Sequence, residues 1–253
     1  MPDPIIINDS NYREHVVPPN ERGKGYMGMW KPGHRPPGTF AGLGIPLIPK
    51  SEWAARIDKQ EELSTNLYHF AISNNLPCKD QGNTNYCWIN APAYCADLIR
   101  LIQCPWEVPS HSPASVGGPI KGFANRGGWG SEGLEYMREF GMNLTQDWPD
   151  NAIDRRYYTE ANKQKAMASR VLEYFVLTNW EEVVSCILSL VPVALGYNWW
   201  SHEVSGVRLA DGGDRLGIRN SWGMGWGDRG HGWLEGNKRM PDDAVAIVSL
   251  QPV

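Results

Sequence analysis

The stretch NSWGMGWGDRG, residues 220–230, begins at the end of the β-type run RLGIRNSW and contains two of the chain's twelve tryptophans. Its surroundings continue the pattern, because the short runs PVALGY, EVSGVRL, RLGIRNSW, GHGWLEG and AVAIVSL fill most of the sequence after Pro192. Turn signals, such as the Asp-Gly-Gly-Asp of residues 211–214, separate these runs. We therefore expect antiparallel strands in the C-terminal part of the chain.

The middle of the chain has a helical pattern instead. Apolar residues recur at helical spacing over residues 87–103, a second helix fits residues 131–140, and a capping box at residues 178–181 opens a third. An earlier helix is expected over residues 51–67, with Ser51 as its cap. Helices followed by antiparallel strands indicate an α+β protein with two unlike halves and a cleft between them.

Composition narrows the classes of function. The chain has 253 residues and a formal net charge of −4, which provides no basic surface for nucleic acid. No apolar run is long enough to span a bilayer, and the N-terminus lacks the cations of a secretory signal. A cytoplasmic location or a place in an assembly is therefore favoured. Five cysteines without a CxxC pair predict a reduced protein without a metal site.

Cys87 lies where the polar loop GNTNY gives way to helical periodicity. A helix N-terminus favours a thiolate, because its free N–H groups and its dipole stabilise negative charge. Attack on an amide also needs hydrogen-bond donors for the developing oxyanion, and the side-chain amide of Gln81 is a candidate donor. The plain alternative is a buried cysteine at the start of a helix.

An imidazole from elsewhere in the chain must complete such a site. Among six histidines, His202 opens the run EVSGVRL and precedes Asn220 by eighteen residues. Two neighbouring antiparallel strands would bring this pair together, and the Asn220 side-chain oxygen would then orient the imidazole. Taken singly, each residue also has an ordinary structural explanation, as a strand histidine or a turn asparagine.

The blocks QGNTNYCW, SHEV and NSWGMGWGDRG together resemble the three signature blocks of papain-like cysteine peptidases. The order Gln, Cys, His, Asn agrees, and RGGW at residues 126–129 resembles the glycine strip that pairs with extended substrate in that family. The resemblance covers roughly residues 70–253. It implies an α+β papain-like fold of two subdomains, a helical half and an antiparallel β-barrel-like half.

The resemblance also implies peptide-bond hydrolysis through a thioester acyl-enzyme, on a peptide or protein substrate and without a metal or organic cofactor. It makes Cys87 the nucleophile and Gln81 an oxyanion donor. His202 would pair with the thiol, Asn220 would orient the imidazole, and an indole would cover their hydrogen bond. The residues that we expect along the cleft are Gly127, Gly128, Trp222, Trp200, Glu203 and Asn85.

Several positions depart from the family's pattern. Thr84 and Asn125 stand where the family has a disulfide, which fits a reducing compartment or a cleft held by other contacts. Pro92, inside the expected catalytic helix, predicts a kink or a displaced helix start near residues 88–92. Trp200 is expected to share the face of His202 and to narrow or roof the cleft. Glu203 is expected in the wall of the pocket for the side chain two positions before the cut, where it would favour basic residues.

The resemblance divides the chain in two. Residues 1–65 are a Pro/Gly-rich N-terminal arm or propeptide-like extension, and residues 66–253 are the peptidase domain, with the helical half mainly at 76–150 and the β half mainly at 178–253. The arm is expected to be irregular, and it is open to three interpretations: a removable propeptide, a permanent part of the fold, or a segment that docks on a partner. The permanent arm is slightly favoured.

Two other functions stay open. The first is a non-catalytic papain-fold component of a larger assembly, anchored through residues 1–50. The departures from the family's pattern that favour it are Asn85, Tyr86, Pro92 and Trp200. The second is an amidase that uses the same Cys–His chemistry on cell-wall peptides or isopeptide bonds. The sequence does not separate those substrates from proteins.

Overall fold

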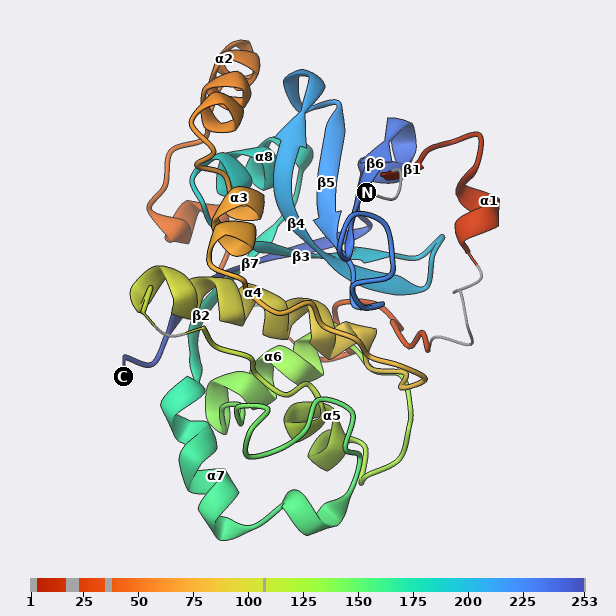
Figure 1. The fold of residues 1–253 in the computed structure, drawn as a ribbon, viewed down its shortest axis with the longest axis vertical. Helices are drawn as coiled ribbons and strands as arrows, with labels where there is room; N and C mark the ends of the chain where they lie inside the picture. Colours follow the sequence, from red (N-terminus) through yellow and green to blue (C-terminus); the bar gives the residue numbers. More distant parts are fainter. Residues whose placement is uncertain (1–3, 17–22, 35–37, 107, 253) are drawn as a thin grey trace.

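The computed structural model describes residues 4–16, 23–34, 38–106 and 108–252. A twisted β-sheet forms one half of the molecule and a group of helices the other, with the long helix α4 (Cys87–Gln103) between them (Figure 1). The fold is therefore α+β with two unlike halves, as predicted. Within the described ranges, no helix has both the length and the apolar character needed to cross a membrane.

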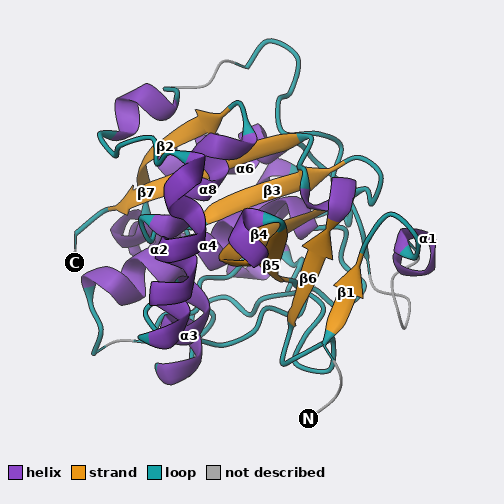
Figure 2. Ribbon diagram, turned by 90° about the horizontal axis from the view of Figure 1, so that it is seen from above, coloured by secondary structure: helices purple, strands orange, loops and turns teal. Residues whose placement is uncertain are grey.

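One sheet contains the seven strands of the described chain, in the order β1-β6-β5-β4-β3-β7-β2. Neighbouring strands are antiparallel except β1 and β6, which are parallel and form one edge (Figure 2). The sheet is open and not closed into a barrel, because β1 and β2 lie at its opposite ends. The strand bounds are β1 Ile5–Ile7, β2 Val171–Leu177, β3 Val193–Tyr197, β4 His202–Ala210, β5 Arg215–Arg219, β6 His231–Glu235 and β7 Asp243–Leu250.

The helices lie on both sides of this arrangement. Helices α5, α6 and α7 lie across α4 from the sheet, whereas α2, α3 and α8 accompany the strands (Figure 1). The α-helix bounds are α1 Tyr12–His15, α2 Lys50–Glu62, α3 Leu67–Ser73, α5 Ala114–Ile120, α6 Gly130–Glu139, α7 Glu160–Ala166 and α8 Trp180–Leu188. Short 3-10 turns are η2 Phe40–Leu43, η3 Arg155–Tyr157, η4 Met167–Ser169, η5 Asp211–Gly213 and η6 Gly236–Arg239.

Helix α4 is the centre of the core. All of its residues from Cys87 to Leu101 are buried, because it packs on β4 and β7 on one side and on α6 on the other. It begins at Cys87 and continues across Pro92 without an interruption, so the displaced start predicted from this proline is wrong. An interior proline costs about 3 kcal/mol, and the enclosing packing of the helix offsets that cost.

Two helix boundaries also differ from those expected. The helix predicted over residues 51–67 is α2 and ends earlier, at Glu62, because the chain turns at Ser64 with a φ of 53° before α3 begins at Leu67. Helix α2 begins directly after Pro49, so Ser51 lies in its first turn and is not its cap. The cap of α8 is Asn179, whose side chain accepts the Glu182 N–H at 2.9 Å, so the helix cap lies one residue later than predicted.

The N-terminal arm contributes to the fold over its described length. Strand β1 extends the sheet beside β6, and Thr39 bridges to Val176 of β2 at the opposite end of the sheet. Helix α2 packs against α8 and buries Trp53 and Ile57. The arm therefore supplies an edge strand, within the part predicted to be irregular, and a helix that contributes to the core, where one was predicted.

Candidate active site

The two elements that carry the predicted nucleophile and imidazole are packed together. Cys87 is the first residue of α4, and His202 is the first residue of β4. The Cys87 thiol is fully buried beside the backbone of Glu203, the residue after His202, and beside the backbone of Gly25 and Tyr26 in the arm. The thiol is thus enclosed by α4, β4 and the N-terminal arm.

His202 and Asn220 meet through the pairing of β4 with β5. The strands are antiparallel, Asn220 directly follows β5, and His202 Nε2 lies 2.8 Å from Asn220 Oδ1. The other ring nitrogen, Nδ1, is buried and has no hydrogen-bond partner among the described residues. Because the Asn220 oxygen can only accept, Nε2 carries the proton and Nδ1 presents a free lone pair.

Two indole rings enclose the imidazole. Trp222 stacks on His202 with ring centroids 4.7 Å apart, and Trp200 meets it edge-on at 5.0 Å. Trp200 is itself fully buried, and its Nε1 donates to the backbone carbonyl of His15 in the arm. Exclusion of water by these rings strengthens the hydrogen bond between His202 and Asn220.

Burial sets the protonation of the pair. It lowers the pKa of His202 to about 3, against the opposing effect of the Asn220 hydrogen bond. It also raises the pKa of Cys87 to about 12, with the nearby Glu203 charge acting in the same direction. Under the arm, the two groups are therefore a neutral thiol and a neutral imidazole at pH 7.

Gln81 is held in one orientation. Its backbone N–H donates to the Ser221 carbonyl at 2.8 Å, and the Ser221 hydroxyl donates to Gln81 Oε1. The amide Nε2 donates to the carbonyls of Thr84 and Gly23, each at 2.8 Å. Gly23 belongs to the arm, so the side-chain amide already binds a peptide carbonyl from a distant part of the chain.

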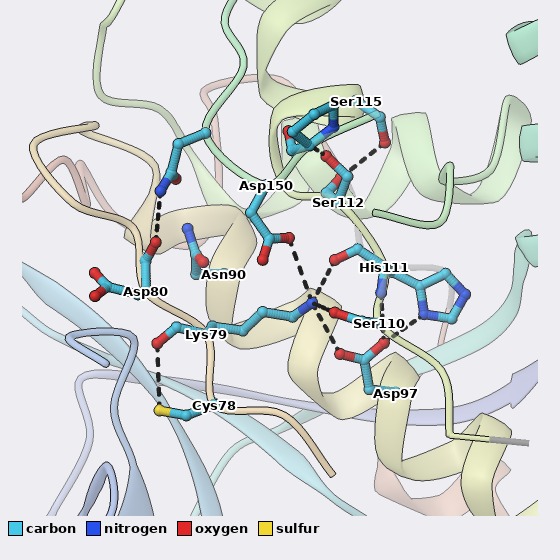
Figure 3. Close-up of polar contacts among 12 residues, drawn as sticks. Cys78, Lys79, Asp80, Asn90, Asp97, Ser110, His111, Ser112, Ser115 and Asp150 are labelled. Atoms are coloured by element: carbon cyan, nitrogen blue, oxygen red, sulfur yellow. Dashed lines mark hydrogen bonds and ion pairs between the residues drawn. The ribbon is translucent and has the colours of Figure 1, made fainter. Parts of the chain in front are cut away.

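A buried ion cluster anchors the segment that carries Gln81 (Figure 3). Lys79 Nζ lies 3.0 Å from Asp97 Oδ2 and 3.6 Å from Asp150 Oδ1. The second Asp97 oxygen lies 2.6 Å from His111 Nδ1. The Lys79 and Asp97 side chains are only 2% and 0% exposed. This Lys79 cluster therefore ties the start of the loop before the thiol to helix α4, on which Asp97 lies.

Residues 23–29 of the arm run along the glycine strip. The Gly128 N–H donates to the Gly25 carbonyl at 2.9 Å, and the Met27 N–H donates to the Gly128 carbonyl at 3.1 Å. Tyr26 and Gly128 thus form a parallel β-bridge. A Cβ on Gly23 or Gly25 would lie within 2.0 Å of a backbone oxygen of the loop before α4, so glycine permits this close approach. In Figure 1 this stretch of the arm passes beside the N-terminal end of α4.

Asparagine hydrogen bonds occupy the place where the family has a disulfide. Asn125 Oδ1 accepts the Asn85 N–H at 2.6 Å, and Asn125 Nδ2 donates to the Asn83 carbonyl at 3.0 Å. All five cysteines are free thiols. The loop before α4 and the segment before the glycine strip are therefore held together without a covalent link.

The residues predicted along the cleft separate into two groups. Gly127 and Asn85 lie against Gly25 of the arm, as Gly128 does, whereas Trp200 and Trp222 pack around the imidazole. Sequence reasoning missed Gly196 and Asp243, which lie beneath the arm. It also missed the arm's own residues in the cleft, for which the unusual glycine spacing of GKGYMG was the available signal.

Comparison with known proteins adds to this geometry. No protein-family model matches the chain. Cathepsin L 2 and cathepsin L 1 of Paramecium tetraurelia are each 27% identical over 177 residues, which are 62% of this chain and 55% of the relative. Among solved structures, xylellain, a cysteine protease from Xylella fastidiosa, superposes with a TM-score of 0.62 at 17% identity, over 92% of this chain and 97% of its own. Digestive procathepsin L 3 of Tenebrio molitor larval midgut gives 0.60 at 17% identity, over 93% of this chain and 77% of its own.

The chain therefore resembles papain-like cysteine peptidases in sequence and has the same fold as the solved structures named above. The papain-like fold expected from the three sequence blocks is confirmed by these superpositions. The chain spans about half the length of the curated relatives it matches. The activity and substrates of this chain are therefore proposals.

Proposed function

We propose that this papain-like chain hydrolyses peptide bonds, with Cys87 as nucleophile and His202 as the group that moves protons. After the thiol proton passes to Nδ1, the thiolate attacks the substrate carbonyl carbon. Gln81 Nε2 and the Cys87 backbone N–H would hold the oxyanion. The amine leaves with the proton from His202, and a thioester remains. Water then attacks the thioester with His202 as base, which releases the carboxylic acid and restores the thiol.

The state of the His202 ring is the observation that supports this proposal most. Asn220 fixes the tautomer, two indoles exclude water, and the buried Nδ1 lone pair has no partner among the described residues. A buried histidine with a purely structural role normally has both ring nitrogens hydrogen-bonded. An oriented but unpartnered nitrogen, on the strand that encloses the Cys87 thiol, suits a catalytic base.

We infer further that residues 23–29 hold the cleft closed. The Gly23 carbonyl accepts a hydrogen bond from the side-chain amide of Gln81. The backbone on either side of Tyr26 is hydrogen-bonded to Gly128. In a substrate, the residues before the scissile bond would lie along the glycine strip. In the arm, the residues on the strip follow Gly23, so the arm runs in the opposite direction and offers no bond for productive attack.

The connections of the arm favour a permanent segment over a detachable one. Strand β1 precedes the covered stretch and Thr39 follows it, and both pair with the main sheet. Residues 23–29 would therefore open by swinging aside, or by cleavage within the chain while the flanking segments stay bound. Intact-mass spectrometry of the purified protein checks whether the chain is cut.

The proposal is tested by labelling the full chain with a peptidyl epoxide that reacts only with an activated thiol. We expect the label on Cys87, no label there in Cys87→Ala, and a rate at least 100-fold lower in His202→Ala. His69→Ala is the matched control, because its ring pairs with Glu61 on the outer surface at 3.0 Å, and it should label at the wild-type rate.

If the label is found on Cys95 or Cys104 and not on Cys87, the result would support a non-catalytic papain-fold component. If Cys87 is labelled but linear peptides are not cleaved, isopeptide and cell-wall peptide substrates become the next candidates for the same chemistry. Mapping the modified residue by peptide mass spectrometry separates these outcomes.

A further inference from the structure

A pocket lies at the opposite end of α4 from the Cys87 thiol. It has a volume of about 300 Å³, and Arg100 lines it together with residues 108–110, 144–146 and 168–169. Arg100 follows Cys87 by thirteen residues on the same helix, which is a separation of about 20 Å along the axis. The pocket is therefore separate from the proposed substrate cleft.

Arg100 is a buried cation without an acidic partner. It is 3% exposed, and its guanidinium donates to the backbone carbonyls of Gln251 at 2.9 Å and of Ala168 at 2.8 Å. No carboxylate among the described residues forms an ion pair with it, and both oxygens of Asp97, three residues earlier on α4, are occupied within the Lys79 cluster. A buried charge that lacks an opposite charge is unfavourable, so this guanidinium favours an anion in the pocket.

The guanidinium and its neighbours supply hydrogen-bond donors for such an anion. The planar fork of Arg100 carries five N–H donors, and the two carbonyls use two of them. Thr145 and Ser169 add hydroxyl groups to the pocket wall. An oxyanion accepts hydrogen bonds from both kinds of donor, and its bonds to a guanidinium are strengthened by charge. The polar part of the wall therefore matches an oxyanion.

The charge and the size of the pocket favour a small carboxylic acid over a phosphate ester. Arg100 is the only ionisable side chain that lines the pocket among the described residues, so one positive charge is available. A carboxylate carries one negative charge at pH 7, whereas a phosphate monoester carries nearly two. Val108, Pro109 and Leu144 form an apolar part of the wall, and 300 Å³ is at the lower end of the range for ligand pockets. This space suits a short apolar chain.

We propose that this pocket binds a small carboxylic acid with a short apolar chain. Its carboxylate pairs with Arg100, and its chain packs against the apolar part of the wall. The ligand lies beside the Lys79 cluster, because Ser110, which lines the pocket, accepts a hydrogen bond from Lys79 Nζ at 3.1 Å (Figure 3). The site therefore adjoins the support of the segment that carries Gln81 and does not reach the thiol.

The test titrates sodium butyrate into the full, isotope-labelled chain at constant ionic strength and follows the backbone amide resonances by NMR. We expect saturable shifts for residues 108–110, 144–146 and 168–169, whereas the resonances around Cys87 stay unchanged. Butyramide has the same shape without the charge, and it should bind at least tenfold more weakly. Cys87→Ala should bind butyrate with the wild-type dissociation constant, so the site is kept even if the proposed peptidase chemistry fails.

Two variants test the pocket wall. Arg100→Gln removes the charge and should weaken butyrate binding at least tenfold. Arg170→Gln is the matched control, because Arg170 donates to the Gln251 side chain at 2.9 Å and does not line the pocket, and its dissociation constant should stay within twofold of wild type. Thr145→Glu tests the same site where Arg100→Gln fails to fold. It places a carboxylate on a half-buried wall residue, which competes with the ligand for the guanidinium, and it should also weaken binding at least tenfold.

Several results would overturn the site. They are shifts that grow without saturation, equal affinity for butyrate and butyramide, and wild-type affinity in a folded Arg100→Gln or in Thr145→Glu. Tighter binding of inorganic phosphate than of butyrate in the same titration would overturn the assignment to a carboxylic acid.

Discussion

Asp97 and Glu203 are both fully buried acids near the proposed site, yet their surroundings are opposite. Asp97 has the Lys79 ammonium 3.0 Å from one oxygen and the imidazole of His111 2.6 Å from the other. Glu203 has no hydrogen-bond partner for either oxygen among the described residues, and burial, with the charge of Asp243, holds its pKa well above the usual range.

This difference indicates two roles for buried acids, one in supporting the fold and one in recognising a substrate. A buried charge that is paired on several sides holds its segment in place, and removal of a partner is costly. A buried carboxyl without a partner weakens the fold unless it is neutral or something else binds it. We therefore expect Asp97 to support the segment that positions Gln81, and Glu203 to line the proposed substrate cleft.

The largest expected effect is on the Lys79 cluster. Lys79→Met leaves Asp97 buried beside only one cationic candidate, so the free energy of unfolding should fall by about 3–5 kcal/mol. Urea denaturation at pH 7 measures this loss. Arg56→Met is the control, because Arg56 forms an exposed ion pair with Glu52 and its removal should cause no resolvable change. If Lys79→Met and Arg56→Met had the same free energy of unfolding, Asp97 would not depend on its ion pair and would not differ from Glu203 in this respect.

Amide replacements of the two acids compare them directly. Asp97→Asn removes a charge that Lys79 needs, and it should cost about 1.5–3 kcal/mol in the free energy of unfolding. Glu203→Gln replaces a group that is neutral in the folded protein but ionised in the unfolded chain at pH 7, so it should raise the free energy of unfolding. A larger loss from Glu203→Gln than from Asp97→Asn, measured in the same urea series, contradicts the assignment.

An effect of pH on stability should also follow from Glu203. Its folded-state pKa is raised, so its contribution to stability is full below the unfolded pKa and is lost as the pH rises toward the folded value. Wild type should therefore lose stability relative to Glu203→Gln between pH 4.5 and pH 7.5. The measurement is the difference in urea midpoint at the two pH values, and an unchanged difference would mean that Glu203 is ionised in the folded protein.

The sequence predicted those parts of the molecule that depend on local pattern. The five C-terminal strands and the start of α4 at Cys87 follow from short-range alternation and helical spacing, and the structure confirms both. The displaced helix start predicted from Pro92 is wrong because the packing around a fully buried helix outweighs one lost backbone hydrogen bond. The family resemblance rested on three blocks far apart in the chain, which fold topology then brought together.

Long-range pairings could not be predicted from local pattern. Nothing in IIIN indicates that β1 would join β6, and nothing near Tyr26 indicates Gly196 and Asp243 as neighbours. Glu203, Gly196 and Asp243 lie in one row only because three strands align in one register. Glu203 was predicted from sequence as a wall residue, whereas the position of Asp243 needed the register of the sheet.

The pH dependence of Cys87 alkylation by iodoacetamide tests the account most directly. We compare Gly25→Val with Gly25→Val/His202→Ala, because a side chain at residue 25 would collide with the Asn85 backbone oxygen and displace the arm from the thiol in both chains. With His202 present, the thiol should give up its proton to the imidazole and react well below the pKa of about 12 that it has when covered, with substantial labelling already at pH 6. Without His202, labelling should rise only near the ordinary thiol pKa of about 8.5. Identical profiles for the two chains would show that sulfur and imidazole do not act as a pair.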